Sequence, residues 1–597
     1  MTWRSKCDNG FAPGPDGCYR CGMQTVVSQK PSRTFVPVDL DPSDFSQIEP
    51  LLHQLRTREP SSPQELSDWL LQISELSAVI DEYGSRRYID KSCHTDDPEI
   101  EKAFLHFVEN IEPRLKPIYF ELQKKYLDSP HRSSLTDQRF QMLTRKWAAD
   151  VEVFRPENVA LETEVTRLVT EYDKICGAMI VEFRGQTYTL QQLARFQEET
   201  DRQTRFEAFE AGVKRRLQDN EKIETIYEKL LSLRQQIAQN AGFDNYRSYT
   251  WKALKRFDYT PEDCHQFSDA IERSVVPLVR QLDRQRQSDL GVDSLRPWDL
   301  AVDPKGRPPL RPFDPNDIDG FVTRTKQIFE RLSPDLAADF ETLRTHGNLD
   351  LQSRPGKQPG GYQCNLEESR QPFIFMNAAG LQRDVETLLH EGGHAFHFLA
   401  AANHEPLTFL RQAPMEFCEV ASMSMEALAS DHYNVFYNDP DNAKRAKHAW
   451  LEGVIRFFPW MATIDQFQHW IYTHPNHTRH QRTEAWLQIS DRFSSIIDWN
   501  GYEHVKASNW MRQLHLFHAP FYYIEYGIAQ IGALQLWMKS RQDPQQALAN
   551  YRKALKLGGT RPLPKLFEAA GLRFDFSSQT IGPLIQAVAE ELAELTN

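Results

Sequence analysis

Two histidines and a glutamate form the most chemically informative pattern in this 597-residue chain. The segment His390-Glu391-Gly392-Gly393-His394 lies in a stretch whose apolar residues recur every three or four positions, which predicts a helix. At about 100° per residue, the two histidines lie within roughly 40° of each other and one turn apart, so both imidazoles can bind one ion. Glu391 lies further round the helix, where its carboxylate can meet a water on that ion.

This division of roles is what zinc chemistry requires. Neutral imidazoles hold the cation, one coordination position stays open for water, and a nearby carboxylate takes the water's proton. Zinc lowers the pKa of bound water from about 15.7 towards about 7, which provides a hydroxide-like nucleophile at neutral pH. Glu391 would act as the general base and then pass the proton to the leaving amine. The pattern therefore predicts peptide hydrolysis with one catalytic zinc ion.

A catalytic zinc needs a third protein ligand, and the residues after His394 exclude one common class. A site of the H-E-x-x-H-x-x-G-x-x-H type would have Gly at position 397 and His at position 400, where this chain has His397 and Ala400. The other common solution is a Glu from a following helix, and the segment 415–426 supplies three candidates: Glu416, Glu419 and Glu426. We favour Glu419, because Ser422 and Glu426 lie on its helical face and can hydrogen-bond to it. Glu416 is the weaker candidate.

Other residues of the same helix are expected to support the ligands. His397 and Glu386 lie on the metal-facing side, and together with Glu426 we expect them to orient the imidazoles. The alternatives are a packing histidine and a surface carboxylate. Gly392 and Gly393 each cost a helix about 1 kcal/mol relative to Ala, so we expect another backbone or a substrate to approach closely there.

Taken together, these motifs resemble the thimet oligopeptidase and oligoendopeptidase F family of zinc peptidases. The resemblance rests on H-E-x-G-H-x-x-H with Glu419 twenty-five residues beyond His394. It also rests on a strand-forming segment at 360–377 and a Tyr-rich segment at 520–526, and it covers about residue 35 to the C-terminus. It implies that His390, His394 and Glu419 bind zinc and that Glu391 is the base.

The same resemblance implies a later histidine and two tyrosines that bind substrate and stabilise the oxyanion. Tyr523 and Tyr526 fit, because they lie about one helical turn apart and can direct two phenol donors at one developing charge. The histidine is His515 or His518, of which we favour His515. The strand 373–376 is expected to pair edge to edge with an extended peptide. The expected substrate-binding residues are Gly360, Gly361, Tyr362, Phe373 and Tyr522.

The elements that must position these residues are almost all helices. Amphipathic stretches occur at 45–55, 63–79, 100–111, 158–175, 190–209 and 220–241. A hairpin is expected at 179–188, and a small sheet from 349–351, 360–364 and 372–376. The Pro-rich segment 296–312 predicts a loop or linker. We expect a mainly α peptidase fold, with two helical lobes around a deep cleft and a small β-sheet beside the active-site helix.

The chain is expected to contain three regions. These are an N-terminal extension at 1–33 without packed structure, an N-terminal helical region at 34–200, and a zinc-peptidase catalytic domain at 201–597. The active-site helices are expected near 381–430 and the substrate segment near 510–536.

Composition excludes several classes of function. The net charge of −13 comes from 70 basic and 83 acidic residues in short alternating patches, so nucleic-acid binding is not expected. No apolar run reaches about 18 residues, and the chain start lacks the apolar region of a secretory signal, so no membrane partner is expected. Eight scattered cysteines predict free thiols and a cytoplasmic location.

Three other sets of polar residues are not expected to bind a metal or take part in catalysis. Cys7, Cys18 and Cys21 lack a fourth ligand for a structural zinc site. The histidines at 469, 474, 477 and 480 are expected in an exposed loop, and the basic residues at 202, 205, 255 and 256 on solvated helical faces.

We therefore predict a cytoplasmic zinc endopeptidase that acts on short unfolded peptides. One alternative is a carboxypeptidase or dipeptidase of the same chemistry, in which a basic residue captures the substrate's C-terminal carboxylate. Another is a catalytically silent zinc- or peptide-binding protein. The presence of Glu391 argues against this second alternative, because binding needs the ligands but not the base.

Overall fold

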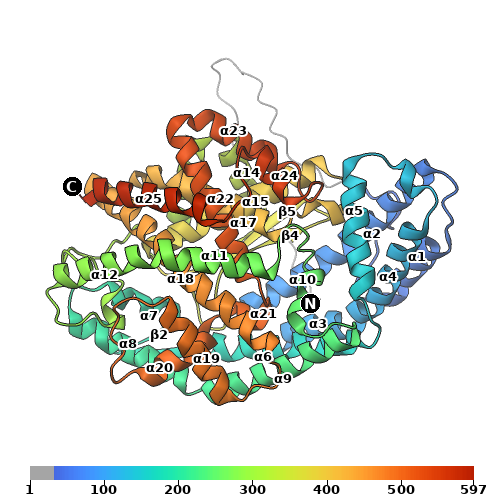
Figure 1. Ribbon diagram of the computed structural model, residues 1–597. Coiled ribbons are helices and arrows are strands. Elements are labelled where there is room, and N and C mark those ends of the chain that lie inside the picture. The colour runs from blue at the N-terminus through green and yellow to red at the C-terminus, as the bar shows by residue number, and fades with distance from the viewer. Residues whose placement is uncertain (1–31, 597) are drawn as a thin grey trace, which may run out of the picture.

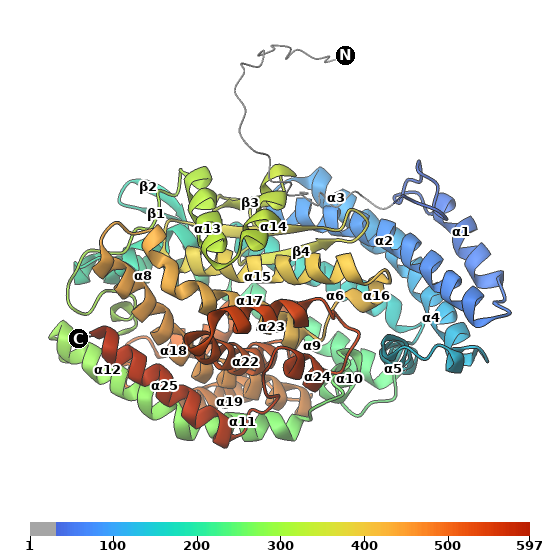
Figure 2. The ribbon, with the colours of Figure 1, turned by 90° about the horizontal axis from the view of Figure 1, so that it is seen from above.

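The computed structural model describes residues 32–596 and is built mainly from helices, as the sequence predicts (Figures 1 and 2). The expected extension at 1–33, with Cys7, Cys18 and Cys21, lies almost wholly outside the described residues. The buried apolar residues form two main cores. The smaller draws on α1 (Phe45–Thr57), α2 (Pro63–Cys93), α4 (Glu112–Asp128) and α5 (Gln138–Val153), which gather at one end of the molecule in both views, and also on Leu407 and Leu410. The larger core runs from Leu168 to Leu592.

Most of the predicted amphipathic stretches are helices. Besides α1 and α2 they form α3 (Pro98–His106, continued by a π turn at Phe107–Ile111), α6 (Asn158–Gly177) and α9 (Asn220–Asn240). The stretch 190–209 is not one helix, and this prediction was wrong. The chain forms α7 (Leu190–Leu193) and a 3₁₀ turn (Ala194–Glu198), and then begins α8 (Arg202–Leu217). The reason is Asp201, whose side chain accepts from the Thr204 N–H and so starts a new helix.

The predicted hairpin and small sheet are both present. β1 (Ile180–Phe183) pairs with β2 (Gln186–Thr189) through a turn at Arg184 and Gly185, whose φ values of 51° and 80° suit a tight two-residue loop. The second sheet contains β3 (Leu349–Gln352), β4 (Tyr362–Leu366) and β5 (Gln371–Ala378) in the order β3-β5-β4. β3 is parallel to β5, and β4 is antiparallel to it.

The order of this sheet corrects one expectation. The segment 373–376 belongs to β5, the central strand, which is paired on both sides and offers no edge to a peptide. The side chain of Phe373 is also buried, in a cluster with Ile89 and Cys93 of α2. Within this sheet, β3 and β4 are the strands with an unpaired edge.

The region of the predicted active site is layered around helix α17. α17 (Met415–Ala429) packs between α15 (Gln382–His404) and α22 (Tyr523–Gln542), and α15 lies against β4 and β5. Gly393 allows this packing, because a Cβ there would lie 2.6 Å from the Ala421 carbonyl oxygen. The expectation of a close backbone approach is thus confirmed for Gly393. At Gly392 the neighbour is instead a side chain, since a Cβ there would lie 2.7 Å from Cζ of Phe329.

We call the helices around the smaller core the N-terminal lobe and those around the larger core the second lobe. The remaining helices complete these two lobes. They are α10 (Tyr246–Ala253), α11 (Pro261–Ser274), α12 (Val276–Leu290), α13 (Ile318–Leu332), α14 (Pro334–Thr345), α16 (Thr408–Arg411), α18 (Pro440–Thr473), α19 (Arg479–Arg492), α20 (Glu503–Ser508), α21 (His515–His518), α23 (Pro544–Leu555), α24 (Leu563–Ala569) and α25 (Ser578–Thr596). The Pro-rich segment 296–312 contains a single 3₁₀ turn, Pro297–Asp299. Among residues 32–596, none of the helices combines the length and apolar character that a bilayer crossing requires.

Candidate active site

His390 and His394 of α15 and Glu419 of α17 converge on one point. One donor atom from each lies within 4.8 Å of the other two. Oε2 of Glu419 is 3.2 Å from Nε2 of His390 and 3.3 Å from Nε2 of His394. We call these three residues the α15–α17 cluster. It contains two imidazole nitrogens and one carboxylate from two adjacent helices, and this donor set suits a divalent cation.

Two of the three ligand candidates, His390 and Glu419, are held from behind by hydrogen bonds. Nδ1 of His390 lies 2.6 Å from Oε1 of Glu426, so the carboxylate can accept the Nδ1 hydrogen and leave the Nε2 lone pair facing the cluster. Ser422 donates to Oε2 of Glu419 over 2.9 Å, and the Tyr522 hydroxyl donates to its Oε1. Glu426 therefore lies where the sequence predicts a supporting residue, whereas the hydroxyl of Tyr522, expected to bind substrate, contacts Glu419.

The charges in the cluster stabilise one another. Burial alone would raise the pKa of Glu419, but the adjacent His394 and His390 hold it well below its usual range. Burial would likewise lower the pKa of His390, but contacts with Glu419 and Glu426 raise it well above its usual value. The surroundings of these imidazoles are therefore strongly negative, as a cation site requires.

Glu391 lies on a different face of α15 and approaches the sheet. Its side chain is only 5% exposed, and Oε2 has no hydrogen-bond partner among the described residues. Burial raises the pKa of Glu391, and the nearby His390 and His394 oppose that rise. A Cβ added to Gly361 would lie 3.5 Å from Oε1 of Glu391, so the chain just before β4 passes directly over this carboxylate.

A histidine and two tyrosines border the cluster. Nε2 of His515 lies 3.2 Å from the hydroxyl of Tyr526, and the His515 ring lies 5.1 Å from that of Tyr523. The ring of Tyr526 is 6.3 Å from that of His390. His518 points elsewhere, since its Nε2 lies 2.7 Å from a carboxylate oxygen of Asp173. The structure thus brings His515, rather than His518, to the two tyrosines.

The other expected substrate residues lie around the start of β4. Gly360 has a φ of 97°, and a Cβ there would lie 3.1 Å from Leu514, the neighbour of His515. The ring of Tyr362 stacks on Phe375 at 4.8 Å and lies 5.3 Å from that of Tyr88. The glycines therefore border the site, whereas the side chain of Tyr362 packs against the sheet and α2.

Three further candidates lie near the cluster without touching its imidazoles. His397 is buried, its Nε2 has no partner among the described residues, and burial lowers its pKa to about 3. Its ring packs against Phe417, so the orienting role expected for it finds no contact here. Glu386 accepts from Gln382, and burial next to Glu426 raises its pKa to about 7. Glu416 accepts from Tyr259.

Sequence reasoning missed the groups that hold the segment 513–522. Arg256 is buried and donates to the Phe521 carbonyl and to Glu525, so the expectation of a solvated face was wrong for it. Arg234 donates to the carbonyls of Leu516 and Phe517. These partners lie more than 260 residues apart in the chain, and no local pattern links them. The expectation of a solvated face was also wrong for Arg205, which is buried and donates to the Trp298 carbonyl and to Asp299.

Two family models match this chain. Residues 195–582 match the model described as peptidase family M3, and residues 35–154 match the peptidase M3 N-terminal domain. The chain belongs to peptidase family M3. It is thus a member of a metallopeptidase family, and the resemblance found in the sequence motifs is confirmed.

Individual relatives agree with this family assignment. The chain is 23% identical over 225 residues to the oligoendopeptidase F homolog of Borreliella burgdorferi, covering 36% of this chain and 37% of that protein. It is 21% identical over 411 residues to the group B oligopeptidase PepB of Streptococcus agalactiae, covering 67% and 65%. The chain thus aligns with less than two thirds of either protein. A solved structure described as PZ peptidase A with inhibitor 2 has a TM-score of 0.89 and 28% identity, covering 94% of this chain and 99% of that one.

This M3 chain contains a second group of potential metal ligands. Cys264 of α11 and Asp465 and His469 of α18 bring donor atoms within 4.8 Å of one another, and all three are buried. We call them the α11–α18 cluster. His469 therefore does not lie in an exposed loop, because α18 continues to Thr473 and buries it. Nδ1 of His469 lies 3.5 Å from the Arg247 guanidinium, and its Nε2 lies 3.3 Å from Asp465.

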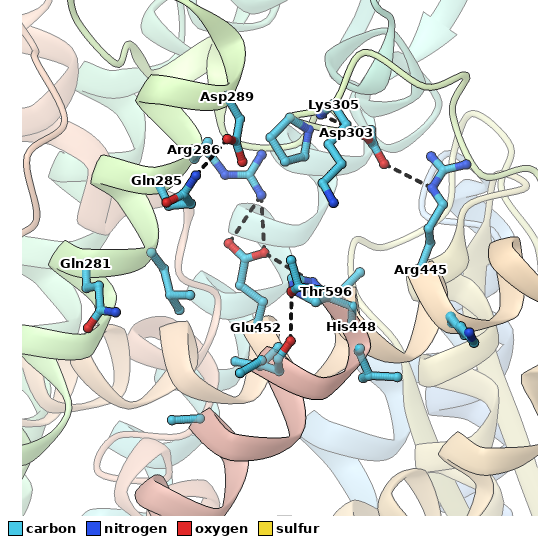
Figure 3. Close-up of a pocket in the computed structure, with 18 of the residues that line it drawn as sticks. Gln281, Gln285, Arg286, Asp289, Asp303, Lys305, Arg445, His448, Glu452 and Thr596 are labelled. Atoms are coloured by element: carbon cyan, nitrogen blue, oxygen red, sulfur yellow. Dashed lines mark hydrogen bonds and ion pairs between the residues drawn. The ribbon is translucent and has the colours of Figure 1, made fainter.

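A cavity of about 1070 Å³ lies between α12, α18, α25 and the Pro-rich segment of this M3 chain (Figure 3). Among its lining residues, Arg286 pairs with Glu452, and Arg445 pairs with Asp303. The cavity meets α15 only at Gln382, one end of that helix. The acidic and basic residues that line the cavity largely neutralise one another. The cavity therefore differs from the α15–α17 cluster both in its position and in its charge.

Proposed function

We propose that the protein is a zinc-dependent endopeptidase that hydrolyses short unfolded peptides. The observation that supports this proposal most directly is the α15–α17 cluster, with the unpartnered carboxylate of Glu391 beside it. The names of its relatives, which include an oligoendopeptidase and an oligopeptidase, agree with it.

The donor set fits zinc. Two imidazoles and one glutamate are a common ligand set of catalytic zinc, and they leave a position open for water or substrate. Glu426 accepts from Nδ1 of His390 and so selects the tautomer whose Nε2 lone pair can bind the ion. We propose His390, His394 and Glu419 as the ligands.

The chain's own residues then supply the proton transfers and the oxyanion contacts. When bound, zinc polarises the scissile carbonyl and acidifies a coordinated water. Glu391 accepts a proton from the attacking water and donates it to the departing amine. Burial keeps the hydroxyls of Tyr523 and Tyr526 protonated, because it raises the pKa of each above its usual value. Tyr526 is proposed to donate to the developing oxyanion, with Tyr523 and His515 beside it.

Substrate recognition is proposed to use main-chain contacts. β4 has a free edge, and the glycines before it border Glu391 and Leu514. An extended peptide added at this edge would be held by its backbone, which demands little of its sequence.

Zinc content and hydrolysis test the proposal together. Purified protein should hold about one zinc per chain by elemental mass spectrometry and should cleave a fluorescence-quenched peptide blocked at both ends. Glu391→Gln should keep its zinc but lose about 10²- to 10⁴-fold in kcat. Glu330→Gln, on the exposed part of α13, is the matched control and should leave kcat unchanged. Undiminished turnover in Glu391→Gln would refute the assignment of the base.

The position of the cuts separates the endopeptidase from the alternatives. Mass spectrometry of the products should show internal cleavage in blocked peptides. Release of C-terminal residues alone, from unblocked peptides only, would establish a carboxypeptidase. Zinc binding without any hydrolysis would establish a silent binding protein.

A further inference from the structure

A series of three hydrogen bonds leads from α18 to the tyrosines of the proposed site. Nε1 of Trp460 donates to Oε1 of Gln513 over 3.0 Å. Nε2 of Gln513 lies 2.7 Å from Nδ1 of His515. Nε2 of His515 lies 3.2 Å from the hydroxyl of Tyr526. Each side chain therefore contacts the next, and the last of them borders the α15–α17 cluster.

Trp460 determines the direction of these bonds. An indole N–H can only donate, so the amide oxygen of Gln513 must face it. The amide nitrogen then faces His515, and because this nitrogen can also only donate, Nδ1 of His515 must offer its lone pair. The hydroxyl of Tyr523 also contacts Trp460 and Gln513, but a hydroxyl can donate or accept and so does not decide the direction.

The direction continues through the imidazole. Burial lowers the pKa of His515 to about 4, so the ring is neutral at neutral pH. A neutral ring with a lone pair on Nδ1 carries its hydrogen on Nε2. That hydrogen points at the oxygen of Tyr526, which accepts it and keeps its own O–H free.

The reverse arrangement shows why this direction matters. If the amide of Gln513 turned over, its N–H₂ would face the N–H of Trp460, and His515 would carry its hydrogen on Nδ1. Tyr526 would then donate its O–H to the bare Nε2 of His515. It would no longer have a hydrogen to offer to a substrate.

We infer that Trp460 and Gln513 are positioning residues that fix the tautomer of His515 and thereby hold Tyr526 as a hydrogen-bond donor towards the substrate. Hydrogen bonds that all run in one direction also polarise one another, which makes the terminal O–H a better donor. The part of this inference that concerns catalysis rests on the proposed function, but the tautomer of His515 does not depend on it.

Substitution at position 513 tests the inference through catalysis. In Gln513→Glu, a carboxylate accepts on both sides, so His515 must place a hydrogen on Nδ1. We expect kcat to fall about 10- to 100-fold, with KM changed less than about two-fold and zinc content unchanged, because one oxyanion donor is weakened. Gln542→Glu, at the exposed end of α22, adds the same charge and should leave kcat and KM unchanged.

Trp460→Phe is a second and milder variant, in case the first does not fold. Without the indole N–H, both orientations of the amide become available, so we expect a smaller loss in kcat at constant KM. Unchanged kcat in both folded variants would overturn the inference. Equal losses in zinc content and in kcat would also overturn it, because they would show a general disturbance of the site.

A direct observation of the ring completes the test. In protein labelled with ¹⁵N-histidine, solid-state NMR distinguishes a hydrogen on Nε2 from one on Nδ1, and His515→Asn identifies the signals of His515. We expect the Nε2–H form in the wild type and its loss in Gln513→Glu. An Nδ1–H form in the wild type would overturn the inference whether or not the protein proves to be a peptidase. Absence of zinc or hydrolysis in the wild type, with the Nε2–H form present, would instead refute the proposed function.

Discussion

Within residues 32–596, the two clusters of potential metal ligands share the same helical spacing but have opposite surroundings. In each, two donors lie four residues apart on one helix and a third comes from a neighbouring helix. Behind the α15–α17 cluster, Nδ1 of His390 faces the carboxylate of Glu426. Behind the α11–α18 cluster, Nδ1 of His469 faces the guanidinium of Arg247.

This difference decides what each histidine can do. An imidazole that binds a cation through Nε2 carries its hydrogen on Nδ1 and needs an acceptor there. Glu426 is an acceptor, but a guanidinium can only donate. His469 therefore keeps its hydrogen on Nε2, which lies 3.3 Å from Asp465 without a hydrogen bond between them, within a buried polar network. The comparison teaches that the partner behind a ligand, more than the ligand itself, distinguishes a metal site from such a network.

The largest effect should come from removing one histidine of each cluster. We expect His394→Ala to lose its zinc and all measurable peptide hydrolysis. We expect His469→Ala to keep both, with a free energy of unfolding lower by about 1–3 kcal/mol, because it removes a buried ring that packs against Trp251 and Phe521. Elemental analysis, peptide cleavage and urea unfolding measure these three quantities. Two zinc ions in the wild type, one of them lost in His469→Ala, would break the comparison.

Removing the partner behind each histidine should also affect zinc affinity in one cluster and not in the other. Glu426→Ala removes the acceptor behind His390 and should weaken zinc binding about 10- to 100-fold. Arg247→Met, which alters the other cluster, should leave the zinc affinity unchanged. Competition with a chelator of known affinity measures both. Equal affinities in the wild type and Glu426→Ala would remove the distinction on which the comparison rests.

The packing between α15 and α17 provides a smaller effect. Gly393→Ala places a Cβ against the backbone of α17, so the free energy of unfolding should fall by about 1–3 kcal/mol. Gly453→Ala in α18 is the matched control, since nothing lies within 4 Å of its Cβ position. There the unfolding free energy should rise by about 0.5–1 kcal/mol. Thermal or urea unfolding compares the two, and equal shifts would contradict the close approach at Gly393.

The smallest effect concerns pH and His397, a buried histidine that belongs to neither cluster. Burial lowers its pKa to about 3 in the folded protein, against about 6.5 in the unfolded chain. As the pH falls below 6.5, the unfolded state binds a proton that the folded state does not, so stability falls. The contribution is at most about 1.4 kcal/mol per pH unit. His397→Phe should lack it, which urea unfolding at pH 6 and pH 5 can show; parallel losses in both proteins would contradict the expectation.

The sequence was most informative where the chemistry lies on one helix. The spacing of His390 and His394 predicts a shared face, and the spacing of Glu419 and Glu426 predicts the ligand candidate and the support that lie together here. The prediction that His397 orients the imidazoles was not supported by a contact. Spacing places His397 on a face of the helix, but it does not show whether a hydrogen-bond partner lies within reach of the ring. Burial without a partner is visible only in three dimensions.

Strand order and distant polar partners were not predictable from local pattern. The run 373–376 reads as a strand in either an edge or a central position, and only its pairing with both neighbours decides between them. Arg256 reads as a surface residue beside Lys255, yet its partners Phe521 and Glu525 lie more than 260 residues away. Gln513 carries no motif, and its importance comes only from the groups on its two sides.

The short helix α16 (Thr408–Arg411) and the residue before it limit how the chain can be divided into fragments. Between α15 and α17, the chain crosses to the N-terminal lobe, and Leu407 and Leu410 join that lobe's core. A fragment beginning at residue 201 would leave both leucines without packing partners and exposed to water. The two lobes should therefore be produced as one polypeptide, and mixing separately purified halves is a poor route to active protein.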